Sequence, residues 1–213
     1  MLIKLLLGWC GAYLLGSIPS GIGWSWLAKR IDVRQHGSGR TGGTNVWRSA
    51  GFWPAFATAL SDILKGACGI WLARSLGLTG WSLALAGTLA VVGHNYSLFL
   101  GFRGGAGTGT SAGAAIALWW PSLPILVITA VIIGLLVGHA SVASITVALL
   151  LPVIFGLRGA WANAVAFGLL TMTLTLWALR PNIQRLRRRE ERFLPIYAEK
   201  PPPICISRHP SHK

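Results

Sequence analysis

The sequence has few charged residues for its length, and very few of them are acidic. Asp, Glu, Lys and Arg together make up 11% of the 213 residues, hydrophobic residues make up 53%, and the mean hydropathy is +0.59. A soluble domain carries about 25% charged residues, so this composition excludes an ordinary soluble fold. We therefore expect an all-α integral membrane protein.

Cysteine is also scarce. The chain has three cysteines, Cys10, Cys68 and Cys205, and their spacing matches neither a metal-ligand motif nor a disulfide pattern. This excludes a disulfide framework and a zinc site as the basis of the fold. We expect no metal and no cofactor.

Long apolar runs, in contrast, are abundant. Several approach the roughly 20 residues that a bilayer crossing needs, and the fourth and sixth are the shortest. The first contains Pro19, where we expect a kink or a break rather than a cleavage site. The sequence predicts about seven transmembrane helices, at 2–26, 51–74, 79–101, 107–120, 123–139, 143–157 and 160–179.

The basic residues fall on one side of these segments. If all seven cross, fifteen of the nineteen Lys and Arg residues share a side: Lys29, Arg30, Arg34, Arg40, Arg48, Arg103 and nine from Arg180 to Lys213. The positive-inside rule makes that side cytoplasmic, with the N-terminus outside and the C-terminus in the cytoplasm. A net charge of +14 would indicate nucleic acid in a soluble chain, but this placement favours membrane lipids as partners. Nothing in the sequence specifies an oligomeric state.

We divide the chain into a membrane domain over residues 1–190 and a tail over 191–213. The tail is basic and contains three consecutive prolines at 201–203. Such a segment is typical of a chain that lies on anionic lipid or is disordered.

A polar, glycine-rich island runs from His36 to Arg48, between apolar segments. Glycines let a backbone approach a ligand closely, and Arg40 and Arg48 suit a phosphate or a carboxylate. The island leads into a predicted helix, whose free N–H groups attract anions. The alternative is a flexible cytoplasmic loop without a ligand.

Three further polar groups interrupt the apolar segments. Asp62 and Lys65 share one helix face, and they form either a structural ion pair or part of a site. A second glycine-rich turn follows Gly93-His94 and runs from Gly101 to Gly107, and two such turns predict two ends of one phosphate-bearing pocket. Small residues also let membrane helices pack tightly, which is the alternative for the glycine run.

The last polar group consists of serines near the sixth segment and an asparagine after the seventh. Ser141 and Ser144 follow His139, and Asn182 follows Arg180-Pro181. Serines in membrane helices often bond only to their own backbone, and a histidine there is typically packed rather than catalytic.

Taken in order, these motifs resemble one family. They are Gly16-Ser17-Ile18-Pro19-Ser20-Gly21, the island with Ser38, Thr44-Asn45 and Arg48, Asp62-x-x-Lys65-Gly66, Gly93-His94, Phe102-Arg103-Gly104-Gly105, Ser141-x-Ala143-Ser144 and Asn182-Ile183. Over about residues 1–190 the chain resembles the bacterial membrane acyltransferases that use acyl phosphate to acylate glycerol 3-phosphate.

The resemblance implies a seven-helix enzyme of phospholipid biosynthesis. It would use acyl phosphate and glycerol 3-phosphate as substrates and make lysophosphatidic acid and inorganic phosphate at the cytoplasmic face of the bacterial plasma membrane. The residues it assigns to catalysis are Ser38, Arg48, Ser144 and Asn182. Those expected to bind substrate or phosphate are Gly37, Gly39, Arg40, Thr44, Asn45, Arg103, Gly104, Gly105 and Ser141, with Asp62, Lys65 and His94 in support.

Three positions depart from the family pattern. Ala106 stands where the family has Lys, and Leu179 and Pro181 stand where it has His and Glu. Arg40, in place of the usual Asn, adds a cation that could supply the missing charge. The departures leave two alternatives open: a relative that binds a lipid or anion without turnover, and a small transporter built around Asp62 and Lys65.

Overall fold

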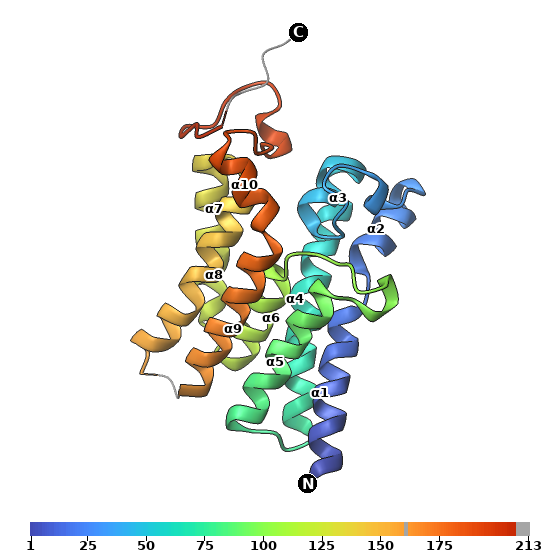
Figure 1. The fold of residues 1–213 in the computed structure, drawn as a ribbon, viewed down its shortest axis with the longest axis vertical. Coiled ribbons are helices and arrows are strands. Elements are labelled where there is room, and N and C mark those ends of the chain that lie inside the picture. The colour runs from blue at the N-terminus through green and yellow to red at the C-terminus, as the bar shows by residue number, and fades with distance from the viewer. Residues whose placement is uncertain (160–161, 208–213) are drawn as a thin grey trace.

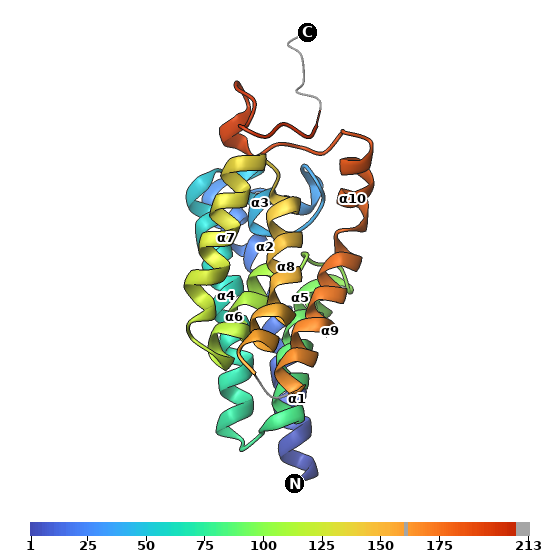
Figure 2. The same ribbon diagram turned by 90° about the vertical axis from the view of Figure 1, so that its left-hand side faces the viewer.

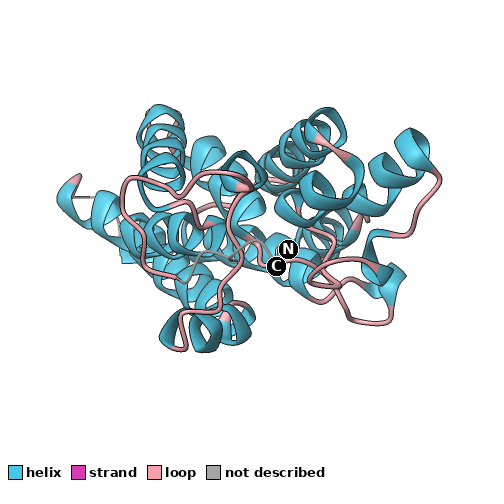
Figure 3. Cartoon of the chain, turned by 90° about the horizontal axis from the view of Figure 1, so that it is seen from above, coloured by secondary structure: helices cyan, strands magenta, loops and turns pink. Residues whose placement is uncertain are grey.

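The computed structural model describes residues 1–159 and 162–207, and these ranges contain helices and loops but no strand (Figure 3). The prediction of an all-α protein is therefore confirmed. The helices are α1 (Leu2–Ser17), α2 (Ser20–Lys29), α3 (Gly43–Ala50), α4 (Phe52–Ser75), α5 (Gly80–Asn95), α6 (Thr108–Leu118), α7 (Ser122–Val137), α8 (Ala140–Leu157), α9 (Ala162–Ala178) and α10 (Arg180–Arg187).

Each of the seven predicted apolar segments contains an apolar helix, but the helices differ in length. Four segments in the described ranges are long and apolar enough to cross a membrane: Leu2–Lys29, Phe52–Ser75, Gly80–Leu100 and Ala140–Leu157. A fifth results if α9 and α10, which meet at a bend of 60°, count as one span. By itself α7 has 16 residues and α6 has 11, which is short of the roughly 20 that a crossing needs. Residues 160–161, at the start of the last predicted segment, lie outside the described residues.

The long helices run side by side along the longest axis of the molecule (Figures 1 and 2). The N-terminus lies at one end of this axis. The helices α3 and α10, and the segment after α10, lie toward the opposite end.

Glycines bring the backbones of neighbouring helices together. A Cβ atom on Gly113 of α6 would overlap the carbonyl of Ile63 in α4, and one on Gly66 of α4 would overlap the carbonyl of Thr110 in α6. Lipid offers no hydrophobic drive for helix association, so close packing of this kind is what holds such helices together. For Gly66 and Gly113, tight packing is the role that the structure supports.

The predicted break in the first apolar segment is confirmed. The helix α1 ends at Ser17 and α2 begins at Ser20, on either side of Ile18 and Pro19. The carbonyl group of Ile18 accepts a hydrogen bond from Nζ of Lys65 in α4 at 3.1 Å. A carbonyl group freed by the break is therefore satisfied by a side chain of another helix.

Residues 188–207 pack on the ends of α7 and α8, whereas the composition favours disorder or contact with lipid. The backbone N–H of Leu194 donates to the carbonyl of Gly138 at 2.7 Å, and that of Ile204 donates to Leu136 at 2.8 Å. The ring of Phe193 stacks on that of His139, with ring centroids 4.5 Å apart. His139 is fully buried, as expected for a packing residue. Residues 208–213 of the predicted tail lie outside the described residues.

Candidate active site

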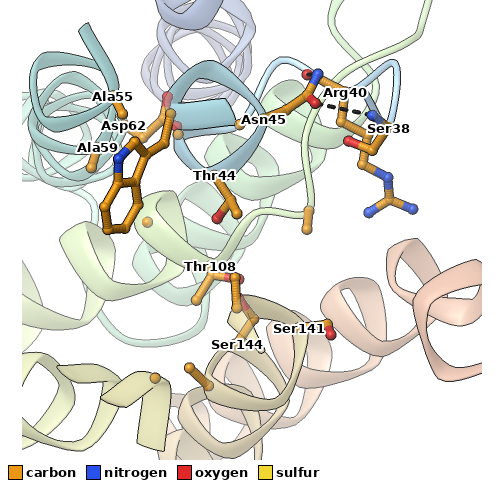
Figure 4. Close-up of a pocket in the computed structure, with 18 of the residues that line it drawn as sticks. Ser38, Arg40, Thr44, Asn45, Ala55, Ala59, Asp62, Thr108, Ser141 and Ser144 are labelled. Carbon is orange, nitrogen blue, oxygen red and sulfur yellow. Dashed lines mark hydrogen bonds between the residues drawn. The ribbon is translucent and has the colours of Figure 1, made fainter. Parts of the chain in front are cut away.

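A cavity of about 460 Å³ lies between α3, α4, α6 and α8 and the chain that follows α9 (Figure 4). It brings together polar residues from the island, from α4 and α5, from the serines of α8 and from the segment after α9. The predicted site residues that line it are Ser38, Arg40, Thr44, Asn45, Arg48, Asp62, His94, Ser141, Ser144 and Asn182.

Three helices begin at this cavity. The N-terminal residues Gly43 of α3, Thr108 of α6 and Ala140 of α8 all line it. The first N–H groups of a helix have no acceptor within the helix, and its N-terminus carries a partial positive charge. A cavity that collects three such ends is suited to an anion.

The glycine-rich island is held in shape by Asn45. Nδ2 of this buried side chain donates to the carbonyls of Val33 and His36 at 3.0 Å each and to that of Arg40 at 2.8 Å, and Oδ1 accepts from the N–H of Ser38 at 3.0 Å. Both protons of the amide are thus used within the loop. Asn45 supports the island, although the sequence places it among the substrate-binding residues.

Arg40 and Arg48 bring two cations with unused donors to the cavity. Nη2 of Arg40 donates to the carbonyl of Ala178 at the end of α9, and Nη2 of Arg48 donates to the carbonyls of Arg192 and Phe193 at 3.3 and 3.1 Å. Nη1 of Arg40 and Nε of Arg48 are buried and have no hydrogen-bond acceptor within residues 1–159 and 162–207.

The burial of these guanidinium groups lowers the pKa of Arg40 and of Arg48 below the ordinary value for arginine. Arginine remains charged at neutral pH even so. A buried guanidinium with a free N–H attracts a phosphate or carboxylate group strongly, because burial reduces the screening of its charge.

Asp62, Lys65 and His94 form a buried cluster beside the cavity. Oδ1 of Asp62 lies 2.8 Å from Nζ of Lys65 and 3.5 Å from Nδ1 of His94, and it accepts from Oγ of Ser20 at 2.6 Å. Asp62 and His94 line the cavity, but Lys65 does not. This arrangement supports the structural ion pair over direct ligand contact for Lys65. In the described part of the chain, no three His, Cys, Asp or Glu side chains lie close enough to hold a metal ion.

The second glycine-rich turn reaches the cavity through other residues than those predicted. Ala106 and Thr108 line it, whereas Arg103 is exposed and the backbones of Gly104 and Gly105 pack against His94. The two turns do meet at one cavity, as their similarity predicts. Gly37 and Gly39 lie outside the lining and shape the island, with φ angles of +57° and +70°.

Two polar residues of the cavity are not among those that the sequence predicts. Oγ1 of Thr108 is buried without a hydrogen-bond partner among the described residues. Glu191 lines the cavity and is 4% exposed, and its carboxylate accepts hydrogen bonds from Ser141, Asn182 and Arg185. The only signal for Glu191 is that an acidic residue is rare in this chain and stands within a run of arginines.

Comparison with known proteins identifies the family. The family model described as glycerol-3-phosphate acyltransferase matches residues 6–189. The chain is 40% identical to the glycerol-3-phosphate acyltransferase of Synechococcus sp. strain CC9902 over 188 residues, which cover 87% of this chain and 93% of that protein. It is also 40% identical to a glycerol-3-phosphate acyltransferase of Thermus thermophilus over 200 residues, covering 88% and 94%.

The fold matches a solved structure as well. The crystal structure of PlsY (YgiH), an integral membrane glycerol 3-phosphate acyltransferase, in its glycerol 3-phosphate form, aligns with a TM-score of 0.83 and 32% identity over 89% of this chain and 94% of that chain. The lysophosphatidic acid form aligns with a TM-score of 0.82. The protein described here therefore belongs to the glycerol-3-phosphate acyltransferase family, with the integral membrane fold of that family.

Proposed function

We propose that this protein transfers an acyl group from acyl phosphate to a hydroxyl group of glycerol 3-phosphate, giving lysophosphatidic acid and inorganic phosphate. The observation that carries the proposal is the convergence of Arg40, Arg48 and three helix N-termini on one cavity. Each substrate brings a phosphate group, and two arginines with unused donors match two phosphates in number and carry the opposite charge. No cofactor is needed for this reaction.

Acyl phosphate is already activated, so alignment of the two substrates supplies most of what the reaction needs. The hydroxyl oxygen attacks the carbonyl carbon, the bond from that carbon to the phosphate oxygen breaks, and inorganic phosphate leaves. A phosphate oxygen of the substrate accepts the proton of the hydroxyl group. Arginine and backbone N–H groups stabilise the negative charge that develops during this step.

The lining residues divide by chemistry in this proposal. Arg48 and Arg40 hold phosphate groups, together with the N–H groups around Thr44. The hydroxyl groups of Ser38 and Ser144 line the same cavity and orient the reacting groups. Asn182 orients the glycerol portion. Thr44, Thr108 and Ser144 lie around one space in Figure 4, although they come from three different helices.

The other side of the cavity is apolar and suits the acyl chain. Ala55, Ala59, Phe52 and Phe56 of α4 line it, and Phe52 and Phe56 are about half exposed. Large exposed apolar side chains on a membrane helix face lipid. The acyl chain therefore enters from the bilayer alongside α4, while its phosphate group lies at the arginines.

The proposed orientation has the cavity on the cytoplasmic side of the bacterial plasma membrane. The N-terminus and the segment 188–207 lie at opposite ends of the bundle, which agrees with an odd number of crossings. The number is seven if α6 and α7 both cross. Most basic residues belong to the island, α10 and the segment after it, and the positive-inside rule places these in the cytoplasm. Acyl phosphate and glycerol 3-phosphate are then taken from the cytoplasm, with membrane lipids around the bundle.

The test is a phosphate-release assay on the purified protein in detergent or lipid. We expect phosphate release that requires both acyl phosphate and glycerol 3-phosphate, and none when acyl-CoA replaces acyl phosphate. Absence of turnover with any pair of substrates would contradict the proposal. It would favour a relative that binds a lipid or anion without turnover, which the replacements at Ala106, Leu179 and Pro181 keep as the second candidate.

A further inference from the structure

Glu191 places a buried carboxylate at the cavity from a segment that follows the helical bundle. One oxygen, Oε1, accepts from Nδ2 of Asn182 at 2.8 Å and from Oγ of Ser141 at 3.1 Å. The other, Oε2, accepts from Nε of Arg185 at 2.8 Å. Three donors from α8 and α10 thus converge on one side chain.

The residues after Glu191 hold it in this position. Arg48 of α3 donates to the backbone carbonyls of Arg192 and Phe193, and the N–H of Leu194 donates to Gly138. Residues 192–194 are thus hydrogen-bonded both to α3 and to Gly138, which follows α7. Glu191 is therefore held by the backbone bonds of the three residues that follow it as well as through its carboxylate.

This geometry determines which way Ser141 and Asn182 present their polar atoms. An ionised carboxylate only accepts hydrogen bonds, and Oε2 of Glu191 forms an ion pair with Arg185 at 2.8 Å. The single proton of the Ser141 hydroxyl is used on Oε1, so its lone pairs remain for the cavity. The nitrogen of the Asn182 amide must face the carboxylate, so Oδ1 remains as an acceptor. No described residue donates to either atom.

The cavity therefore offers two kinds of polar group. Arg40 and Arg48 offer N–H donors, which suit the oxygens of a phosphate group. Ser141 and Asn182 offer acceptors, which suit the O–H groups of a polyol. We infer that Glu191 is a positioning residue that keeps Ser141 and Asn182 as acceptors for the hydroxyl groups of the glycerol portion of the substrate. The inference rests on the proposed function, because it assigns part of the same site.

The test compares two acceptors that differ by one hydroxyl group: glycerol 3-phosphate, and 3-hydroxypropyl phosphate, which lacks the hydroxyl on the middle carbon. Their dissociation constants are measured by titration calorimetry without acyl phosphate, and their kcat/KM values are measured with it. We expect the wild-type protein to prefer glycerol 3-phosphate by about tenfold or more, because a lost hydroxyl leaves acceptors in the cavity without a donor.

The substitution Glu191→Gln should remove this preference. Glutamine has similar volume, but its amide cannot accept from Ser141, Asn182 and Arg185 together, since one of its two ends is a donor. The ratio of the two affinities should fall towards one. A merely structural role for Glu191 would weaken both acceptors by the same factor and leave the ratio unchanged.

Two further variants complete the experiment. Glu190→Gln changes the neighbouring carboxylate, which is exposed and does not line the cavity, and should keep the wild-type ratio. Ser141→Ala leaves Glu191 with two of its three partners and removes one acceptor, so it should also lower the ratio, even if Glu191→Gln fails to fold.

The possible failures are distinguishable. A wild-type ratio in a folded Glu191→Gln variant, or no preference in the wild type, overturns the inference. If Glu191→Gln does not fold, a wild-type ratio in Ser141→Ala overturns it. Absence of phosphate release by the wild type contradicts the proposed function instead. The binding ratio still tests the role of Glu191 in that case, because it needs no turnover.

Discussion

Replacement of Arg40 by Asn tests whether the island supplies the cation that the second glycine-rich turn lacks. Ala106 lines the cavity without a charge, whereas Arg40 brings a guanidinium whose Nη1 is buried and has no acceptor among the described residues. In the proposed function a phosphate oxygen takes that place. The substitution removes this charged donor and also the bond from Nη2 to the carbonyl of Ala178.

The size of the effect follows from the kind of bond that is lost. A hydrogen bond between charged groups contributes about 1.5–3 kcal/mol, and about 1.4 kcal/mol corresponds to a factor of ten. Arg40→Asn should therefore lower kcat/KM by about ten- to a hundredfold. Arg40→Lys keeps the charge but not the planar fork of donors, so its kcat/KM should lie between that of the wild type and that of Arg40→Asn.

Arg34 provides a matched control on the same stretch of chain. Its side chain is 43% exposed and pairs with Asp32, with Nη2 2.7 Å from Oδ2. This bond lowers the pKa of Asp32, but an exposed ion pair contributes only about 0–1 kcal/mol. Arg34→Asn should thus leave phosphate release within a few-fold of the wild type.

The assay is steady-state phosphate release at varied concentrations of each substrate, with the melting temperature in detergent as a check on folding. A rise in KM for one substrate alone would show which phosphate Arg40 binds. Kinetics of Arg40→Asn equal to those of Arg34→Asn would refute the reasoning, since a free buried guanidinium would then contribute nothing to the reaction.

Three other substitutions test the packing and the polar lining. Lys65→Met should destabilise the fold by about 3–5 kcal/mol, seen as a lower melting temperature, because it leaves the buried carboxylate of Asp62 without its cation. Gly113→Ala should destabilise by about 1–3 kcal/mol because the added methyl overlaps the backbone of α4, whereas Gly23→Ala, with open space around it, should not; equal melting temperatures would contradict the close packing. Thr108→Val should preserve the melting temperature, since the hydroxyl has no partner among the described residues, yet reduce phosphate release; full activity would remove this hydroxyl from the site.

The fold class was predictable because it depends on composition and on local patterns. Apolar runs of nearly bilayer length and a low content of charge are properties of short stretches of chain. The break beside Pro19 is similarly local, since proline lacks the N–H that a continuous helix needs. Helix lengths were less predictable: α6 is only 11 residues long because it ends where Trp119 turns the chain toward α7.

The roles of single polar residues were harder to predict. Asn45 and Arg40 both lie in the island, but one uses its donors on the loop and the other keeps a donor free. Lys65 could have faced a ligand, yet its Nζ donates to the carbonyl of Ile18, which the break after α1 leaves available. These outcomes depend on the partners that distant segments bring, which residue type and spacing do not contain.

The sequence by itself determined that this is a helical membrane protein and, through the order of its motifs, which family it belongs to. Only the tertiary structure decided which polar side chains meet at one cavity and which of their atoms are free. Glu191 illustrates the difference, because it follows Asn182 by nine residues in a basic run and becomes part of the cavity only when the chain folds back onto α8. A hydrogen bond depends on direction and distance, and these are fixed when segments far apart in the chain pack together.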